Sequence, residues 1–184
     1  KSPDFETPLD SDKDNSYSVR ISAKDNNANT SYQNLSVKIL DVDEISPEIT
    51  GLSGDAGDLT SSVSLNENLS SVGTFTANET VIWSIQGGDD LDKFSIDGST
   101  GALSFKNSPD FEIPLDSNKD NTYSVNIAAT DANSNSTEQT LTVKILDVDE
   151  IPPDITGLSG KAGDLTSSVS INENLSSIGT FTAN

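Results

Sequence analysis

The sequence lacks several residue types on which common active sites and metal sites depend. None of its 184 residues is cysteine, histidine or methionine. The absence of cysteine excludes disulfides and thiolate ligands, and the absence of histidine excludes zinc sites, haem ligation and the commonest nucleophile–base pairs. No apolar run approaches the roughly 20 residues of a membrane-spanning helix. Oxygen atoms are therefore the only abundant metal ligands.

Basic and aromatic residues are also scarce. Ten Lys and Arg residues face 30 Asp and Glu residues, which gives a formal net charge of −20, and aromatics make up 5% of the chain. Such a charge excludes ordinary nucleic-acid binding, which needs basic patches to meet phosphate. A compact acidic body repels itself unless cations offset the charge. Hard oxygen ligands suit calcium or magnesium, so these two are the metals that the composition favours.

The strongest pattern in the sequence is an internal repeat. Residues 1–78 align without a gap on residues 107–184, and 59 of the 78 aligned pairs are identical. A period of 106 residues is too long for a solenoid unit and fits one small domain. We expect a tandem array with the end of one copy at 1–44, a complete copy at 45–150 (the central copy) and the start of a third at 151–184. We interpret the sequence as an excerpt of a longer polymer or, alternatively, as a subunit that exchanges strands with its neighbours.

Seven segments of the central copy alternate apolar and polar residues with a period of two. They are rich in Val, Ile, Phe, Tyr and Thr, and Gly, Asp, Asn and Pro separate them, which is typical of strands. No segment shows a helical period, so we expect an all-β fold with almost no helix. Seven short strands in about 100 residues predict a Greek-key β-sandwich whose core includes Trp83, Tyr123, Val125 and Ile127. The segments are 63–65, 73–77, 81–85, 94–96, 102–105, 123–129 and 141–145.

Acidic and amide side chains recur at alternate positions in two loops of each copy. Oxygen ligands at this spacing let a tight loop wrap one hard cation, as in the first half of a calcium loop. No bidentate glutamate follows at the usual spacing, so these loops are not EF-hands. Solvated turns between strands are the alternative. The candidate ligands are Asp116, Asn118, Asp120, Asp131, Asn133 and Asn135 in the central copy, and Asp10, Asp12, Asp14 and Asp25 before it.

The linker after each copy concentrates carboxylates, and an acidic pair precedes the first loop. Alternation in an extended chain puts Asp147 and Asp149 on one side. Carboxylates crowded at a domain end repel each other, and a divalent ion would turn that repulsion into a crosslink. The linker and pair residues are Asp147, Asp149, Glu150, Asp110 and Glu112, and their counterparts are Asp41, Asp43, Glu44, Asp4 and Glu6.

The order and spacing of these motifs resemble those of bacterial cadherin-like tandem repeats of large secreted surface adhesins. The resemblance covers the whole sequence and implies cadherin-like sandwiches with calcium ions bound between successive domains. The motifs that carry it are Asn66-Glu67-Asn68 before Gly73-Thr74, Phe94-Ser95-Ile96-Asp97 with Thr100-Gly101, Asp110-Phe111-Glu112, Ala129-Thr130-Asp131, and Asp147-Val148-Asp149-Glu150 with Pro153.

The resemblance also implies a ligand set, and the sequence departs from the family at two points. The family's D-A-D loop after the second strand is missing; Glu79 is the acidic residue there that is available to replace one ligand. Ile151 stands where the family has the last Asn of the linker, so the number of ions per junction stays open. The implied ligands are Glu67, Asp110, Glu112, Asp131, Asp147, Asp149 and Glu150, and Glu173 repeats Glu67 in the third copy.

These patterns predict a calcium-stiffened structural repeat of an extracellular or cell-surface adhesin stalk or filament that mediates adhesion. Near-verbatim copying suits a spacer better than a catalytic site, and the acids lie on turns and linkers, so we expect no enzyme. The alternatives are a self-assembling filament subunit with strand exchange and a glycan- or protein-binding module. Tyr32, the one aromatic residue that looks free, becomes Glu138 in the next copy. The expected partners are neighbouring repeats of the same polymer, and other cells, surfaces or glycans.

Overall fold

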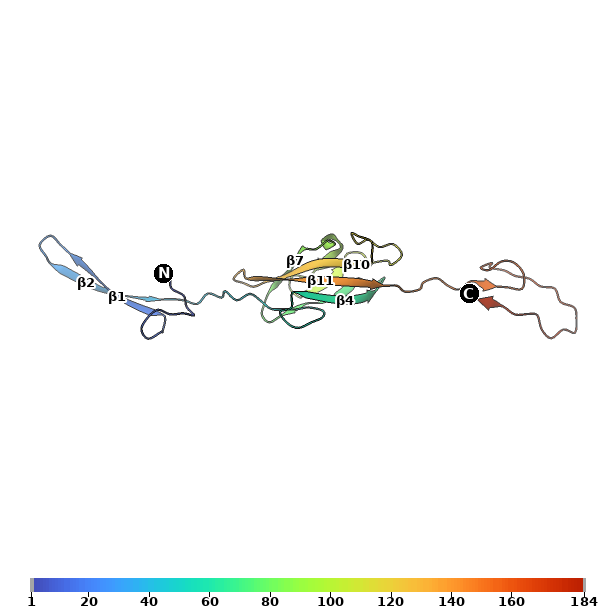
Figure 1. The fold of residues 1–184 in the computed structure, drawn as a ribbon, viewed down its shortest axis with the longest axis horizontal. Helices are drawn as coiled ribbons and strands as arrows, with labels where there is room; N and C mark the ends of the chain where they lie inside the picture. The colour runs from blue at the N-terminus through green and yellow to red at the C-terminus, as the bar shows by residue number, and fades with distance from the viewer. Residues whose placement is uncertain (1, 184) are drawn as a thin grey trace. The chain divides into compact units, whose positions relative to one another are not determined.

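The structure, a computed structural model, describes residues 2–183. It divides into two compact units, one that ends at Leu146 and one that begins at Asp147 (Figure 1). The one helical element of the described residues is a single 3-10 turn, η1 (Leu91–Lys93), so none is long and apolar enough to cross a membrane. The expected all-β fold is therefore confirmed. The strands are β1 Ser16–Lys24, β2 Thr30–Lys38, β3 Ile49–Thr50, β4 Thr60–Asn66, β5 Ser71–Thr74, β6 Thr76–Ala77, β7 Ile82–Gly87, β8 Phe94–Ile96, β9 Ala102–Phe105, β10 Thr122–Thr130, β11 Ser136–Leu146, β12 Ile155–Thr156 and β13 Thr182–Ala183.

The central copy is a sandwich of two sheets. Strands β4, β11, β10 and β7 form one sheet in that order, as Figure 1 shows, and β5, β9 and β8 form the other. Strands β10 and β11 are antiparallel, whereas β4 joins β11 in parallel, with Val63 opposite Val143. The predicted seven-stranded sandwich is confirmed, and the structure adds a short pair of β3 with β6.

Period-two alternation builds the core. In β11, Leu141, Val143 and Ile145 are fully buried, while Thr142 and Lys144 between them point away from the core. Each such side chain contributes about 1.5–3 kcal/mol by leaving water. The four residues predicted to face the core are all at most 6% exposed. The ring of Tyr123 meets the rings of Phe94 and Phe105 edge-on, with centroids 6.1 and 5.0 Å away.

The structure divides one of the predicted strands. The sequence predicted a single run at 73–77, but the chain pairs with β9 through β5 and then with β3 through β6. Between them lies Phe75, whose N–H donates to the carbonyl of Gly101 at 3.0 Å and whose ring is 1% exposed. Alternation alone could not show this change of partner, because both halves bury the same kind of side chain.

A buried carboxylate ties the loop before β10 to the sandwich. Asp90 is 2% exposed; its Oδ1 accepts a hydrogen bond from the N–H of Ser117 at 2.7 Å and its Oδ2 one from the N–H of Ser124 at 2.9 Å. The Asp90 N–H donates in turn to the Ser124 carbonyl. Two hydrogen bonds thus join Asp90 to β10, and the third holds the loop that contains the first predicted cation ligands.

The remaining elements repeat parts of the central copy. Strands β1 and β2 pair in the register of β10 and β11, with Tyr17 opposite Val37 as Tyr123 is opposite Val143. In the second unit, β12 pairs with β13 in the register of β3 with β6, with Ile155 opposite Ala183. Local structure therefore follows the internal repeat.

The turn between β8 and β9 gives a prediction about acid stability. Hydrogen bonds from the N–H of Thr100 and Ser99 to Asp97 Oδ1, at 2.8 and 2.9 Å, lower the pKa of Asp97 below its ordinary 3.8. A lowered folded-state pKa stabilises the fold above the unfolded pKa, and that stabilisation is lost as the pH falls through the folded value. We expect Asp97→Asn to lower the free energy of unfolding at pH 7 more than at pH 3, measured by urea melts. An equal loss at both pH values would contradict this account.

Candidate metal centre

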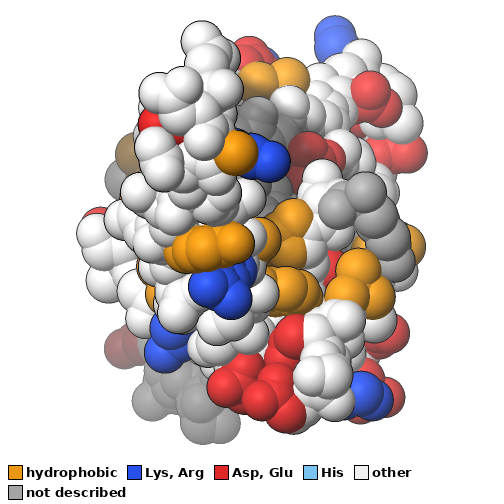
Figure 2. Space-filling model, turned by 90° about the vertical axis from the view of Figure 1, so that its left-hand side faces the viewer, with side chains coloured by type: hydrophobic (Ala, Val, Ile, Leu, Met, Phe, Trp, Pro, Cys, Tyr) orange, Lys and Arg blue, Asp and Glu red, His pale blue; other side chains and the backbone are white. Residues whose placement is uncertain are grey.

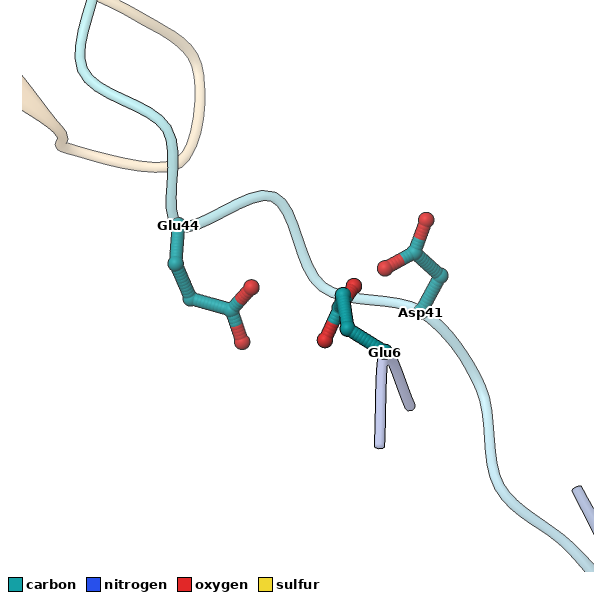
Figure 3. A group of neighbouring side chains, drawn as sticks. All are labelled: Glu6, Asp41 and Glu44. Carbon is teal, nitrogen blue, oxygen red and sulfur yellow. The ribbon is translucent and has the colours of Figure 1, made fainter. Parts of the chain in front are cut away.

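The first acidic cluster lies where the segment before β1 meets the linker 39–48. One carboxylate oxygen from each of Glu6, Asp41 and Glu44 lies within 4.8 Å of the other two. Figure 3 shows the Glu6 carboxylate between those of Asp41 and Glu44. A hydrogen bond with its own backbone lowers the pKa of Glu6, but desolvation, a hydrogen bond with Asp41 and the charges of Glu44 and Asp41 raise it above its ordinary value. The neighbouring carboxylates of Asp41 and Glu44 therefore disfavour the ionised form of Glu6.

The second cluster shares the same linker. Asp43 lies with Glu79 and Asp131, again with one oxygen of each within 4.8 Å of the others. Glu79 comes from the segment after β6, and Asp131 follows β10 and is 8% exposed. Desolvation and the negative charges of Asp43 and Asp131 raise the pKa of Glu79. Two carboxylates of the sandwich, those of Glu79 and Asp131, thus lie close to the Asp43 carboxylate of the linker.

Asp131 is held in place by the turn that the sequence singled out. Its Oδ1 accepts hydrogen bonds from the N–H groups of Asn133 and Asn135, both at 2.8 Å, and its Oδ2 accepts one from the Asn135 side chain at 2.8 Å. Although desolvation opposes them, these bonds keep the pKa of Asp131 below its ordinary value. Asn135 Nδ2 also donates to the Asp43 carbonyl at 2.8 Å. Asn135 therefore positions both an ionised carboxylate and the linker backbone.

The acids of the first linker divide between two clusters. Alternation predicted that Asp147 and Asp149 share one side of the second linker; in the first linker, Asp41 joins Glu6 and Glu44 whereas Asp43 joins Glu79 and Asp131. Residues 39–48 form no strand, so the period-two rule does not apply to the first linker. The same linker therefore supplies two separate clusters.

A third cluster lies at the other end of the central copy. Glu67, Asp110 and Glu112 bring one oxygen each within 4.8 Å. Glu67 is 3% exposed, and its Oε2 accepts a hydrogen bond from the N–H of Phe111 at 2.8 Å. The sequence had predicted all three residues as ligands through its cadherin-like motifs. Glu173, the repeat counterpart of Glu67, lies in the second unit, as do Asp147, Asp149 and Glu150, the counterparts of Asp41, Asp43 and Glu44.

The loop before β1 forms a fourth cluster, and its counterpart before β10 differs. Asp10, Asp12 and Asp14 bring one oxygen each within 4.8 Å. In the central copy, Asn118 replaces the middle acid, and Asp116 is 3% exposed. The Asp116 carboxylate accepts hydrogen bonds from the N–H groups of Asp120 and Asn121 at 2.8 and 3.2 Å. The buried Asp116 carboxylate thus closes the loop formed by residues 116–121.

Two further predicted ligands form local turns. Asp25 repeats the turn of Asp131, with hydrogen bonds from the N–H groups of Asn27 and Asn29 at 2.9 and 2.8 Å. The Asn29 side chain and these N–H groups lower the pKa of Asp25. Asp4 Oδ1 accepts a hydrogen bond from the N–H of Thr7 at 2.9 Å. Among the acidic clusters of residues 2–183, none includes Asp25 or Asp4.

The donor set of these clusters fits calcium. Calcium takes six to eight oxygen ligands at about 2.3–2.6 Å, so oxygens up to about 4.8 Å apart can share one ion. The clusters offer carboxylate oxygens within that limit, and backbone carbonyls and water can complete the shell. The chain has no thiolate or imidazole that would favour zinc or copper.

Comparisons with solved structures bear on the fold. The extracellular domain of protocadherin gamma B4 is 22% identical, with a TM-score of 0.50 over 83% of this chain and 24% of that one. A protocadherin gamma B7 structure of domains EC3–6 as a cis-dimer is 17% identical, with a TM-score of 0.50 over 84% of this chain and 39% of that one. At this identity the likeness shows a cadherin-like β-sandwich fold. The chain spans well under half of each structure. No family model matches the sequence, and neither does any curated protein.

Proposed function

We propose that this chain is a stretch of a calcium-stiffened extracellular adhesin stalk, built from tandem cadherin-like copies divided at residues 44/45 and 150/151. The observation that carries the proposal is the sharing of one linker by two acidic clusters. Asp41 and Glu44 belong to a cluster with Glu6 from the segment before β1, whereas Asp43 belongs to one with two acids of the sandwich. Ions in both clusters would tie the linker both to the copy before it and to the central copy.

Electrostatics explain why stiffness would depend on the ion. Three carboxylates within 4.8 Å repel one another, and this repulsion adds to desolvation in raising the pKa values of Glu6 and Glu79. A divalent cation replaces the repulsion with attraction and fixes the linker conformation. Without the cation, the carboxylates repel one another, and the linker becomes conformationally more flexible the more negative charge it carries.

The internal repeat extends the assignment to the next junction. The counterparts of Asp41, Asp43 and Glu44 are Asp147, Asp149 and Glu150, and we assign these to cation binding in the next linker, as we assign Glu112, the counterpart of Glu6, in the central copy. Glu67 and Asp110 complete that set, and Glu173 repeats it in the third copy. The loops of Asp10, Asp12 and Asp14 and of Asp116, Asn118 and Asp120 are secondary cation sites. Asp4 and Asp25 instead close local turns, and Asn133 and Asn135 position Asp131.

The differences between copies also favour a spacer. Identity between aligned copies is high, and exposed strand positions carry many of the changes, such as Arg20 to Asn126 and Tyr32 to Glu138. Arg20 and Tyr32 form a cation–π pair at 3.9 Å in the first copy that the second cannot form. A recognition surface would keep such a pair, whereas a stalk needs only its core and its junctions.

Calcium removal tests the proposal. Ligand that binds only the folded state stabilises it by about 2.7 kcal/mol at a hundredfold excess over Kd. We expect calcium to raise the Tm of the full chain by roughly 10 °C, since 1 kcal/mol moves the Tm of a domain of this size by about 4–8 °C. We also expect chelation to increase the spread of dimensions in small-angle X-ray scattering. Unchanged melting and scattering would remove calcium from the mechanism, and magnesium at equal concentration is the control.

A further inference from the structure

The central copy begins and ends its sandwich with two neighbouring strands. Strand β4 is the first long strand after the linker 39–48, and β11 ends directly before the next linker. The two strands are parallel from Thr60 opposite Thr140 to Asn66 opposite Leu146, and their arrows point the same way in Figure 1. The chain enters β4 at one end of this pair and leaves β11 at the other. A pull on both ends of the copy therefore draws β4 and β11 in opposite directions along their length.

Parallel strands that are pulled in this way resist as a unit. Their hydrogen bonds run from strand to strand, so a force along the strands loads all of them together, whereas a force across the strands opens them one after another. The ladder extends beyond β4 at both of its ends. The Thr140 N–H donates to the Leu59 carbonyl at 2.9 Å, and the Glu67 N–H donates to the Leu146 carbonyl at 3.0 Å. Separation along the strands must therefore break the whole ladder at once.

A buried polar pair, Ser61 and Gln139, locks this ladder at the end where β4 begins. The Ser61 hydroxyl donates to Oε1 of Gln139 at 2.9 Å, and Nε2 of Gln139 donates to the Asp58 carbonyl at 2.6 Å. Ser61 and Gln139 are 6% and 1% exposed. A Cβ on Gly51 would overlap Oε1 of Gln139, so the backbone at Gly51 lies directly against the pair. The Gln139 side chain thus joins β11 both to β4 and to the segment just before it, in a site shielded from water.

The two sides of the ladder favour one register. On the inner side, Val63 and Leu65 pack against the core opposite Val143 and Ile145. The outer side is uncharged and polar along β4, as is much of the surface in Figure 2, and its exposed residues there are Thr60, Ser62 and Ser64. A slip of one residue would turn both apolar side chains of β4 to the outer side. The apolar packing therefore opposes sliding together with the ladder and the Ser61–Gln139 lock.

The residues of the lock recur in the neighbouring copies. Gln139 repeats Gln33, although the residues on both sides of it differ between the two copies. The counterparts of Gly51, Asp58 and Ser61 are Gly157, Asp164 and Ser167. Each copy of the array therefore has the residues for the same lock wherever the sequence covers it, as a feature that works copy by copy along a polymer requires.

We propose that the β4–β11 ladder, with its Ser61–Gln139 lock, is the element of each copy that resists tension along the chain. The inference rests on the proposed stalk, because tension acts on a chain that is held at both ends. The β3–β6 pair lies earlier in the chain, but it has only two register pairs and separates first. The lock then receives the load where β4 begins. Because no cation takes part, the copy resists tension with or without calcium.

Single-molecule pulling of the full chain by its two ends, in chelator, tests the lock. Forced unfolding is governed by the unfolding rate. We expect Ser61→Ala to raise that rate at least tenfold at a fixed force, because Gln139 loses its donor. The matched control is Tyr123→Phe, which also removes one buried hydroxyl and leaves the Leu115 N–H without its acceptor, but lies outside the ladder. The proposal is overturned if Ser61→Ala causes no acceleration, or if Tyr123→Phe accelerates unfolding as much or more.

The direction of pulling provides a second test that leaves the lock intact. The chain has no cysteine, so handles can be attached through Leu59→Cys and Glu138→Cys, two exposed positions at the same end of the ladder. This force acts across the strands and opens the ladder from that end. We expect the copy to unfold at less than half of the force that it withstands through its two ends. Equal forces would show that the parallel arrangement gives no resistance and would overturn the proposal. Both tests are done in chelator, so a failure of the calcium-stiffened stalk in melting and scattering leaves their outcome unchanged.

Discussion

Replacing Asp131 with alanine is expected to weaken the tightest calcium-binding event of the full chain about a hundredfold. Asp131 supplies the most buried carboxylate of the cluster with Asp43 and Glu79. Its lowered pKa keeps it ionised, and the side chain of Asn135 links it to the linker carbonyl. Loss of even a supporting residue typically costs 10–100-fold in metal affinity, and a direct ligand costs at least as much. Calorimetric titration with calcium measures the change.

The matched control is Asp25→Ala. Asp25 makes the same turn hydrogen bonds from Asn27 and Asn29 as Asp131 makes from its own asparagines, but no cluster found among residues 2–183 includes it. The two variants therefore lose the same local turn, and only one loses a cluster. We expect Asp25→Ala to bind calcium with nearly unchanged affinity. If both variants lose calcium affinity equally, the loss is caused by the disrupted turn and not by the disrupted cluster.

Alternation in the sequence was sufficient to predict the sandwich and its core. The inward side chains of β10 and β11 follow a strict period of two, and one apolar face can be buried only in one register. Trp83 and Tyr123 were placed correctly for the same reason, because a lone large aromatic residue on an alternating strand has few alternatives to the core. The sequence was less able to predict which strands pair with each other. The division at Phe75 depends on which sheet each half meets.

The acidic clusters were predicted in composition but not in grouping. The motifs named Glu67, Asp110 and Glu112 among seven implied ligands, and the structure brings these three together. Residues 39–48 form no strand, so alternation could not predict that Asp41 and Asp43 join different clusters. Position along an irregular segment depends on contacts from distant residues, such as the Asn135 hydrogen bond to the linker carbonyl, and no local pattern contains them.

Strand propensity also could not predict which of two nearly identical segments forms a strand. Residues 60–66 and 166–172 have nearly the same sequence, and only the first is a strand, because β11 lies beside it. Strand preference reflects packing against neighbours more than the residue itself. Asp90 was missed for a related reason. Its neighbour Asp89 has the same side chain and is exposed, and only the fold distinguishes them.

Asp90→Ala is expected to lower the free energy of unfolding of the central copy by about 3 kcal/mol. The substitution leaves the N–H groups of Ser117 and Ser124 without their acceptor, and a hydrogen bond to a charged group contributes about 1.5–3 kcal/mol. Because small domains are stable by only about 5–15 kcal/mol, this is a large fraction of the total. Urea melts in chelator isolate the effect from calcium.

Asp89→Ala separates burial from charge. It removes the same negative charge one residue earlier, from an exposed side chain, so we expect a change within about 0.5 kcal/mol, as for most surface substitutions. Asp90→Asn should fall between the two, because the amide keeps one acceptor oxygen but brings two donors into a buried site. Asp90 holds the loop of Asp116 through Ser117, and the Tyr123 hydroxyl accepts a hydrogen bond from the Leu115 N–H just before it, so the near-ultraviolet signal of Tyr123 should melt early in Asp90→Ala. If Asp89→Ala and Asp90→Ala cost the same, net charge and not the buried acceptor would be responsible.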